Sequence, residues 1–191
     1  ALLLAVELLL FEWKPPRFPP VAVAAVGAAA VRPLVMGGAP LFPYAGSVDV
    51  SAAHVVAFAA LGIVAGLGSG VLTTLVYAAE DGFAKLPFHW MWWPAIGGLV
   101  IGLGGLIEPA ALGVGYDNIR HLLAGDLALH AVLLLLAVKV VIWAVALGSG
   151  TSGGVLAPLL IFGGALGALA APFMPEAAPG FWALLGMAAM M

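Results

Sequence analysis

Long runs of apolar residues alternate along this chain with short stretches rich in proline, glycine or charge. The runs over 51–79 and 127–147 each have the length that an apolar α-helix needs to cross a lipid bilayer. The remaining runs are shorter, and several begin or end at prolines, which stop helices or open their first turn. The pattern predicts an all-α chain, with further helices over 1–13, 18–35, 93–107, from 155 towards Pro175, and from 181 to 191.

Three connecting stretches have a more mixed pattern. Residues 108–126 are amphipathic, with apolar residues on one helical face and charged residues elsewhere, which predicts a short helix at the membrane interface. Residues 80–89 predict a polar connection. The sequence Met91-Trp92-Trp93 that follows is typical of the aromatic belt of a membrane protein.

Small and charged residues interrupt two of the long helices. Gly62, Gly66 and Gly70 are spaced four residues apart, so they would present a smooth stripe to a neighbouring helix. Lys139 lies in the middle of the helix predicted over 127–147. A lysine there is expected to extend its ammonium to the interface or to pair with other groups inside the bundle.

Composition extends this picture to the whole chain. Hydrophobic residues make up 64% of the sequence and charged residues 8%, and the mean hydropathy is +1.20. Because a soluble domain has roughly a quarter of its residues charged, the chain is predicted to be a polytopic integral membrane protein of the plasma or inner membrane, with the lipid bilayer as its surroundings.

Several classes of function are disfavoured by the same counts. The net charge of −3 argues against a nucleic-acid partner. The chain has no cysteine and no cluster of histidines or carboxylates with the spacing of a metal site, so no metal or other cofactor is expected. We expect no covalent chemistry, and therefore no enzyme.

The stretch from Gly148 to Pro158, with the sequence GSGTSGGVLAP, joins two apolar helices through small uncharged residues. A second helix beginning near Val155 with Pro158 in its first turn would have free amides at its start, because the first N–H groups of a helix have no partner within it. With the positive end of the helix dipole behind them, the amides of Val155, Leu156 and Ala157 could hold an anion without any basic side chain.

Three other interpretations of this stretch compete with an anion site. The glycines could serve only to let two membrane helices turn and pack. A phosphate loop of the Walker type fails because no lysine follows the glycines. The sequence Gly150 to Gly153 resembles the Gly-x-Ser-Gly motif of the rhomboid intramembrane proteases, with Ser152 as nucleophile. That chemistry needs a base, normally a later histidine, and all four histidines precede Ser152, at His54, His89, His121 and His130.

The residues from Gly148 to Pro158 also resemble the Gly-x-Phe-x-Pro signature of the CLC family of chloride channels and chloride/proton antiporters. The resemblance extends over nearly the whole chain. Leu4 to Leu8 is similar to the family's helix H, Pro94 to Ile119 to its helix K and the loop into helix L, and Phe181 to Met191 to the start of helix O. The resemblance implies that residues 1–191 are part of one CLC transmembrane domain, roughly helices H to O, truncated at both ends.

Membership of that family would imply a homodimer in which each subunit has its own pore, built from two inverted halves. Helix N would present its amides to a central chloride, with Pro158 fixing the helix start and the glycines before it allowing close approach. Leu156 stands where the family usually has phenylalanine, which leaves pore width and halide preference open. The anion-binding residues that follow are Gly153, Gly154, Val155, Leu156, Ala157 and Pro158. The dimer interface would lie near 1–13 and 18–35.

The resemblance also bears on mechanism. Glu7 is an intramembrane carboxylate, for which a role in the proton pathway is a hypothesis. Antiporters often carry a second glutamate directly after it, and here that position is Leu8, which cannot carry a proton. This favours a channel or an uncoupled transporter, with a chloride/proton antiporter as the alternative and a transporter for fluoride or nitrate as a further one. The gating glutamate and the pore tyrosine of the family would lie outside the chain, so these residues alone should not conduct.

Overall fold

The computed structural model describes residues 18–38, 42–44, 46, 49–151 and 153–191. They belong to two units, which divide the chain after Pro43. In the first unit, helix α2 covers Phe18–Met36, which confirms the helix predicted over 18–35. Two prolines open its first turn, where a missing N–H does no harm.

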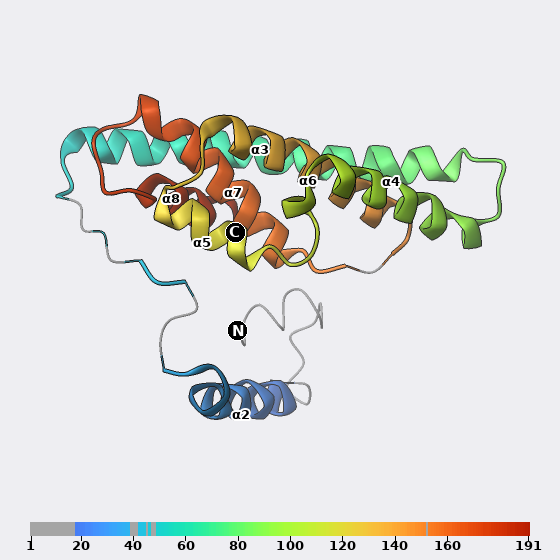
Figure 1. The fold of residues 1–191 in the computed structure, drawn as a ribbon, viewed down its shortest axis with the longest axis horizontal. Coiled ribbons are helices and arrows are strands. Elements are labelled where there is room, and N and C mark those ends of the chain that lie inside the picture. Colours follow the sequence, from blue (N-terminus) through green and yellow to red (C-terminus); the bar gives the residue numbers. More distant parts are fainter. Residues whose placement is uncertain (1–17, 39–41, 45, 47–48, 152) are drawn as a thin grey trace. The chain divides into compact units, whose positions relative to one another are not determined.

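Every regular element that the structure describes in the second unit is a helix, in agreement with the predicted all-α class. Its four helical stretches that are long and apolar enough to cross a membrane are Ala52–Ala84, Trp90–Ile107, Leu129–Gly148 and Leu156–Phe173. The elements are α3 (Ala52–Ala84), η3 (Trp90–Trp92), α4 (Trp93–Ile107), η4 (Pro109–Ala111), α5 (Tyr116–Ala124), α6 (Leu129–Gly148), α7 (Leu156–Ala170), η5 (Ala171–Phe173) and α8 (Phe181–Met190) (Figure 1).

Helix α3 is longer than predicted. The expected connection over 80–89 was wrong for its first five residues, because α3 continues to Ala84. The change from apolar to polar residues at Glu80 therefore does not end the helix. Phe83, which is buried and lies with its ring centroid 6.0 Å from that of Trp93, holds the last turn against α4.

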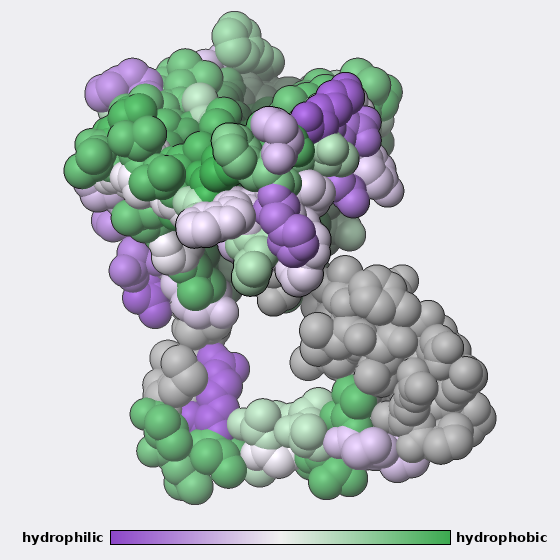
Figure 2. Space-filling model, turned by 90° about the vertical axis from the view of Figure 1, so that its right-hand side faces the viewer, coloured by the Kyte–Doolittle hydropathy of each residue, from purple (hydrophilic) through white to green (hydrophobic). Residues whose placement is uncertain are grey.

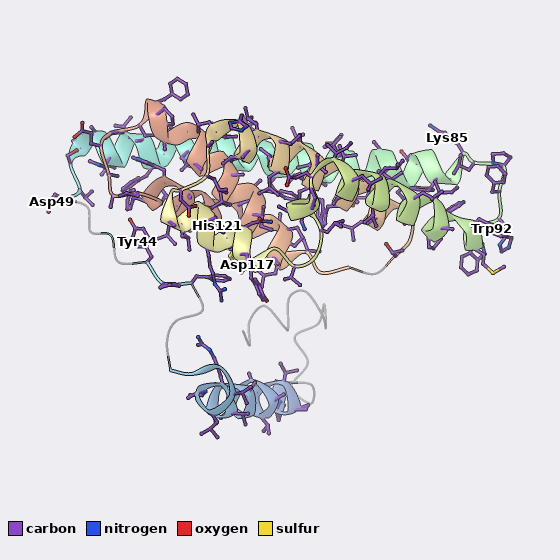
Figure 3. The ribbon with its side chains drawn as sticks, viewed as in Figure 1. Tyr44, Asp49, Lys85, Trp92, Asp117 and His121 are labelled. Atoms are coloured by element: carbon purple, nitrogen blue, oxygen red, sulfur yellow. The ribbon has the colours of Figure 1, made fainter. Side chains whose placement is uncertain are left out.

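The two ends of α3 carry the polar and aromatic groups expected at membrane interfaces. Asp49 lies just before the helix, and Lys85 and Trp92 lie beyond its other end (Figure 3). Of the predicted belt Met91-Trp92-Trp93, Met91 and Trp92 are more than half exposed and Trp93 is half-buried. That these residues lie at a membrane interface stays a prediction. Between these ends α3 exposes many apolar side chains, among them Val56, Ile63 and Leu67. Figure 2 views the side on which Lys85 and Trp92 lie in Figure 3, where hydrophobic and hydrophilic residues are mixed.

Glycines set how closely the helices pack. Helix α4 lies against α6, since a side chain added at Gly97 would collide with Ser149 and one added at Gly104 with Ile142. The stripe of Gly62, Gly66 and Gly70 in α3 has no described residue within 4 Å of the positions that added side chains would take, so its neighbouring helix remains a prediction.

Helix α7 runs through the middle of the unit and contacts α3, α5, α6 and α8 (Figure 1). Its closest partner is α8. A side chain added at Gly163 or Gly167 of α7 would collide with the backbone of α8, and one added at Gly186 of α8 would collide with α7. This backbone contact is the small-residue packing expected between membrane helices. On its other side the fully buried ring of Phe162 meets Trp143 of α6, with centroids 5.4 Å apart.

Candidate functional site

The chain breaks its helical course between α6 and α7. Helix α6 ends at Gly148 and α7 begins at Leu156, so the two are separate helices joined by a non-helical segment. Gly150 has φ +80°, a left-handed conformation that glycine adopts without steric cost. The turn at Gly150 therefore stops α6 within the apolar part of the chain.

The end of α6 is closed by hydrogen bonds. The carbonyl oxygen of Ala146 accepts from Ser149 Oγ at 2.7 Å and from Thr151 Oγ1 at 2.5 Å. The Ser149 amide donates to the Val145 carbonyl at 2.9 Å, and the Gly150 amide to the Leu147 carbonyl at 3.0 Å. Since the last carbonyls of a helix otherwise lack partners, these bonds satisfy the negative end of α6. The two hydroxyl contacts were not anticipated from the sequence.

The start of α7 is open by comparison. The Val155 carbonyl, just before the helix, accepts from the Leu159 amide at 3.1 Å. No side chain caps the helix, and no residue that the structure describes accepts a hydrogen bond from the amides of Val155, Leu156 or Ala157. Pro158, the third residue of the helix, has no N–H to offer. Three consecutive donors are thus left at the positive end of the helix dipole.

The sequence on both sides of this helix start is uncharged, and the glycines before it are exposed. The chain contains no Asp, Glu, Lys or Arg between Lys139 and Glu176. Gly153 and Gly154 are exposed, and a side chain added at Gly154 would have no neighbour within 4 Å. Residues 155–158 are half-buried. The site therefore consists of backbone donors reached past glycines, which is chemistry suited to an anion.

The structure places the predicted residues as follows. The second helix begins within one residue of the predicted position, Val155, and Pro158 lies in its first turn. That an anion binds Gly153, Gly154, Val155, Leu156, Ala157 or Pro158 stays a prediction. Glu7, Leu8 and Ser152 lie outside the described residues, and so does the helix predicted over 1–13. Within the described parts, no three His, Cys, Asp or Glu side chains gather in the arrangement of a metal site.

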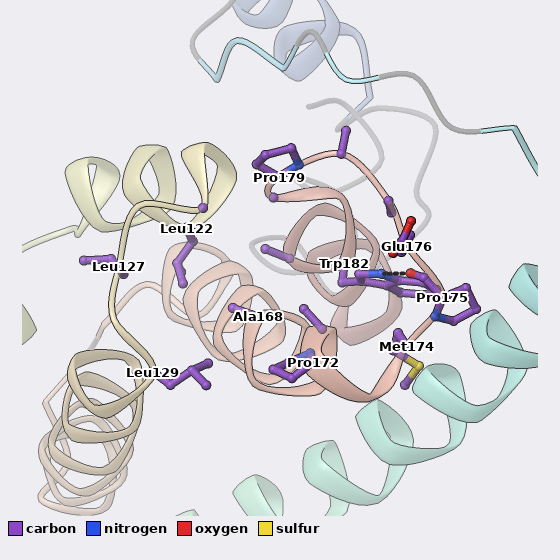
Figure 4. Close-up of a pocket in the computed structure, with 16 residues that line it drawn as sticks. Leu122, Leu127, Leu129, Ala168, Pro172, Met174, Pro175, Glu176, Pro179 and Trp182 are labelled. Carbon is purple, nitrogen blue, oxygen red and sulfur yellow. Dashed lines mark hydrogen bonds between the residues drawn. The ribbon is translucent and has the colours of Figure 1, made fainter.

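A cavity of about 590 Å³ lies at the other end of α7. It is bounded by the last turn of α7, by the loop from Met174 to Gly180 and by Trp182, whose Nε1 donates to the Pro175 carbonyl at 3.1 Å (Figure 4). Ala168 in its wall is twelve residues from Leu156, or about 18 Å along the helix. The free amides at the start of α7 are not part of this cavity.

Lys139 of α6 is buried, with 5% of its surface exposed. Its ammonium donates to the Ala111 carbonyl at 2.7 Å and to the Gly113 carbonyl at 2.8 Å. The lysine therefore pairs within the bundle, which was one of the two outcomes expected. Its partners are carbonyls of the segment between α4 and α5. Ala111 lies 28 residues before Lys139 in the sequence, so no short sequence motif indicated this contact.

Comparison with known proteins agrees with this architecture. The sequence model of the family described as voltage gated chloride channel matches residues 1–191. Two proteins named voltage-gated ClC-type chloride channel ClcB, from Escherichia coli strain SMS-3-5 and from Escherichia coli O157:H7, are each 34% identical to this chain over 151 residues. The aligned part is 78% of this chain and 36% of each of those proteins. The chain thus belongs to the voltage-gated chloride channel family, the CLC family whose signature its residues 148–158 resemble.

Proposed function

We propose that this protein moves chloride, or a similar small anion, across the membrane, and that the free amides at the start of α7 hold the ion on its way. The observation that carries the proposal is the uncapped start of α7, where Val155, Leu156 and Ala157 have no described acceptor. The relatives are named as chloride channels, which supports chloride as the ion.

Backbone amides suit an ion that must bind and then leave. A permeating anion has to exchange its water for protein donors without becoming trapped, and neutral amides attract it less strongly than a guanidinium or ammonium in direct contact. Gly153 and Gly154 would let the ion approach the amides closely, since neither carries a side chain. Pro158 would fix the helix start without competing for the ion. Each of the six positions from Gly153 to Pro158 thus has a physical role in the proposal.

The amides can be tested one at a time in the full-length protein. Replacing Leu156 by its α-hydroxy acid turns the amide into an ester, which removes the N–H and keeps the side chain. Because hydrogen bonds to a charged group contribute about 1.5–3 kcal/mol, chloride affinity measured by calorimetry should fall about tenfold or more. Chloride efflux from liposomes should fall with it at low chloride.

The same replacement at Leu159 is the matched control. The Leu159 amide already donates to Val155 within the helix, so the ester there should lower stability and leave chloride affinity nearly unchanged. Equal affinity in the Leu156 ester and the unmodified protein would exclude this amide from the site. A full-length protein that neither binds nor moves chloride would refute the proposed function as a whole.

We further propose that chloride movement is not coupled to protons through Leu8, because a leucine has no titratable group. Antiport with protons is the alternative. Recording the pH inside liposomes during chloride uptake separates the two, since a stoichiometric proton movement opposite to chloride would establish the antiporter.

A homodimer is also proposed, with the interface near residues 1–13 and 18–35. The support comes from α2, whose apolar residues are widely exposed, including Val23 (72%), Val26 (69%) and Leu34 (86%). Light scattering of the detergent-solubilised protein tests this, and the mass of a single chain would contradict it.

A further inference from the structure

Lys139 is a basic side chain buried in the apolar interior of a membrane helix bundle. Placing a charged ammonium there costs free energy unless other groups compensate it. The carbonyls of Ala111 and Gly113 each accept one of its hydrogen bonds, at 2.7 and 2.8 Å. No carboxylate of the described residues lies within salt-bridge distance of this ammonium. Two neutral acceptors hold the group in place, and among the described residues its charge has no counter-ion.

The acidic residue nearest in sequence to these acceptors points elsewhere. Glu108 precedes η4, and its Oε1 accepts from the Ala110 amide at 3.2 Å, at an exposed position. The ammonium therefore sends an uncancelled positive field into the low-dielectric surroundings of α6 and α7, where screening by water and salt is weak.

The segment that Lys139 holds runs beside the first turns of α7 (Figure 1). Gly115, two residues beyond Gly113, lies directly against the side chain of Ile161. Ile161 is five residues from Leu156, or about 7 Å along the helix. Through Gly113, Gly115 and Ile161, the ammonium is on the order of 15–20 Å from the free amides. At this distance the ammonium cannot contact an ion held by the amides, but it still attracts that ion electrostatically.

We propose that Lys139 is a remote positive charge that raises the affinity of the α7 amides for an anion. The proposal rests on the proposed function of that helix start and adds a residue that does not touch the ion. There is a physical reason for keeping the positive charge away from the amides that contact the ion. A cation in contact with chloride would bind it too firmly for passage, whereas a cation at this distance attracts it without forming a bond.

The expected size follows from Coulomb's law. At an effective dielectric constant of about 20, a unit charge 15–20 Å away corresponds to roughly a four- to sixfold gain in affinity for a monovalent anion. The effect is smaller than that of removing one amide donor, so the two contributions can be told apart.

The test compares Lys139→Gln with Lys139→Arg in the full-length protein. Glutamine is neutral and keeps N–H donors for the Ala111 and Gly113 carbonyls, while arginine keeps the charge. Calorimetric titration with chloride should show roughly four- to sixfold weaker binding for Lys139→Gln and near-normal binding for Lys139→Arg. Equal affinities in Lys139→Gln and the unmodified protein would overturn the inference and reduce Lys139 to a structural clamp.

A second pair of variants covers the case in which Lys139→Gln does not fold. Leu112 lies between the two acceptor residues and is 43% exposed. The Leu112 side chain lies against Gly105, so Leu112→Glu would place a carboxylate on the segment that Lys139 holds and partly offset the positive field, and Leu112→Gln is its uncharged control. Weaker chloride binding in Leu112→Glu alone supports the proposal, and identical binding in both overturns it. Absence of chloride binding in the unmodified protein would instead refute the proposed function, so the two failures are distinguishable.

Discussion

Only seven residues separate the end of α6 from the start of α7, yet the two helix ends differ in their hydrogen bonding. At Ala146 two hydroxyls donate to one carbonyl, and the carbonyls on either side of it, those of Val145 and Leu147, accept from the amides of Ser149 and Gly150. At Leu156 the helix begins with donors that no described residue accepts from. The carbonyls at the end of α6 are therefore satisfied by residues next to them in the sequence, whereas the first amides of α7 have no described acceptor.

The difference shows what fixes each helix. The hydrogen bonds that complete the end of α6 are local and come from Ser149, Gly150 and Thr151. The start of α7 has no local cap, so its position has to come from packing along the rest of the helix. That packing is the backbone contact of Gly163 and Gly167 with α8 and the burial of Phe162. An open helix start is thus possible because the body of the helix is held firmly.

The largest effect is expected where this packing is disturbed. In Gly167→Ala the new methyl group would overlap the carbonyl of Trp182, which is backbone and cannot rotate away. We expect a loss of about 2–3 kcal/mol in the free energy of unfolding, which is the upper part of the range for an overpacked core. Thermal unfolding of the detergent-solubilised protein, followed by fluorescence, measures it.

Gly82→Ala is the matched control for this substitution. Gly82 also lies in a helix, but a side chain there would have no described neighbour within 4 Å. Alanine should therefore be neutral, or stabilise by about 0.5–1 kcal/mol through its better helix propensity. Equal stability of the two variants would show that contact with α8 does not hold α7.

An intermediate effect is expected at the closed end. Ser149→Ala combined with Thr151→Val removes both hydroxyls from the Ala146 carbonyl. Losing these bonds in a buried setting should lower the free energy of unfolding by about 1–2 kcal/mol. Chloride affinity should change by less than about twofold, because the amides of α7 keep their positions. A large loss of affinity with unchanged stability would show that the closed end belongs to the anion site.

Thr73→Val provides the control for the loss of a hydroxyl. Thr73 Oγ1 also donates to a carbonyl, that of Ser69 at 3.0 Å, but the pair is exposed. The Ser69 carbonyl keeps the helical hydrogen bond from the Thr73 amide, and valine suits an apolar surface, so the substitution should cost less than about 0.5 kcal/mol.

The two helix ends also differ in how far the sequence could predict them. The start of α7 was predictable because its signals are local: a cluster of glycines, then an apolar run with a proline in its first turn. The closing of α6 was harder, since Ser149 and Thr151 read only as small residues of a flexible link. Their hydroxyls find Ala146 only after the turn at Gly150 has formed.

Contacts between distant residues were beyond local reasoning altogether. The sequence marks Lys139 as unusual but gives no reason to choose the carbonyls of Ala111 and Gly113 among many. The glycine stripe of α3 stood out by its regular spacing, yet the glycines that meet the backbone of another helix include Gly163 and Gly167 of α7, Gly186 of α8 and Gly148 of α6, and none of that stripe meets a described residue. Regular spacing shows that a surface is smooth, whereas the fold decides which helix covers it.

The end of α3 shows a further limit of the apolar pattern. Polarity at Glu80 was interpreted as the end of a helix, but it marks only the end of the apolar stretch. Glutamate, aspartate and alanine are all compatible with a helix that continues into water. A hydropathy pattern therefore locates the membrane-embedded part of a helix better than it locates the helix terminus.

The smallest effect is expected from the side chain at the open end. Leu156→Phe restores the residue usual in the family and leaves the amide in place, so chloride affinity should stay within about twofold of the unmodified protein. Leu156→Ala, which removes bulk from the same half-buried position, should behave alike if backbone donors carry the binding. What should shift is the relative rate of chloride and the larger bromide in liposome flux, because the side chain limits the space in front of the amides. A tenfold change in chloride affinity in either variant would mean that the side chain, and not the exposed backbone of α7, provides the site.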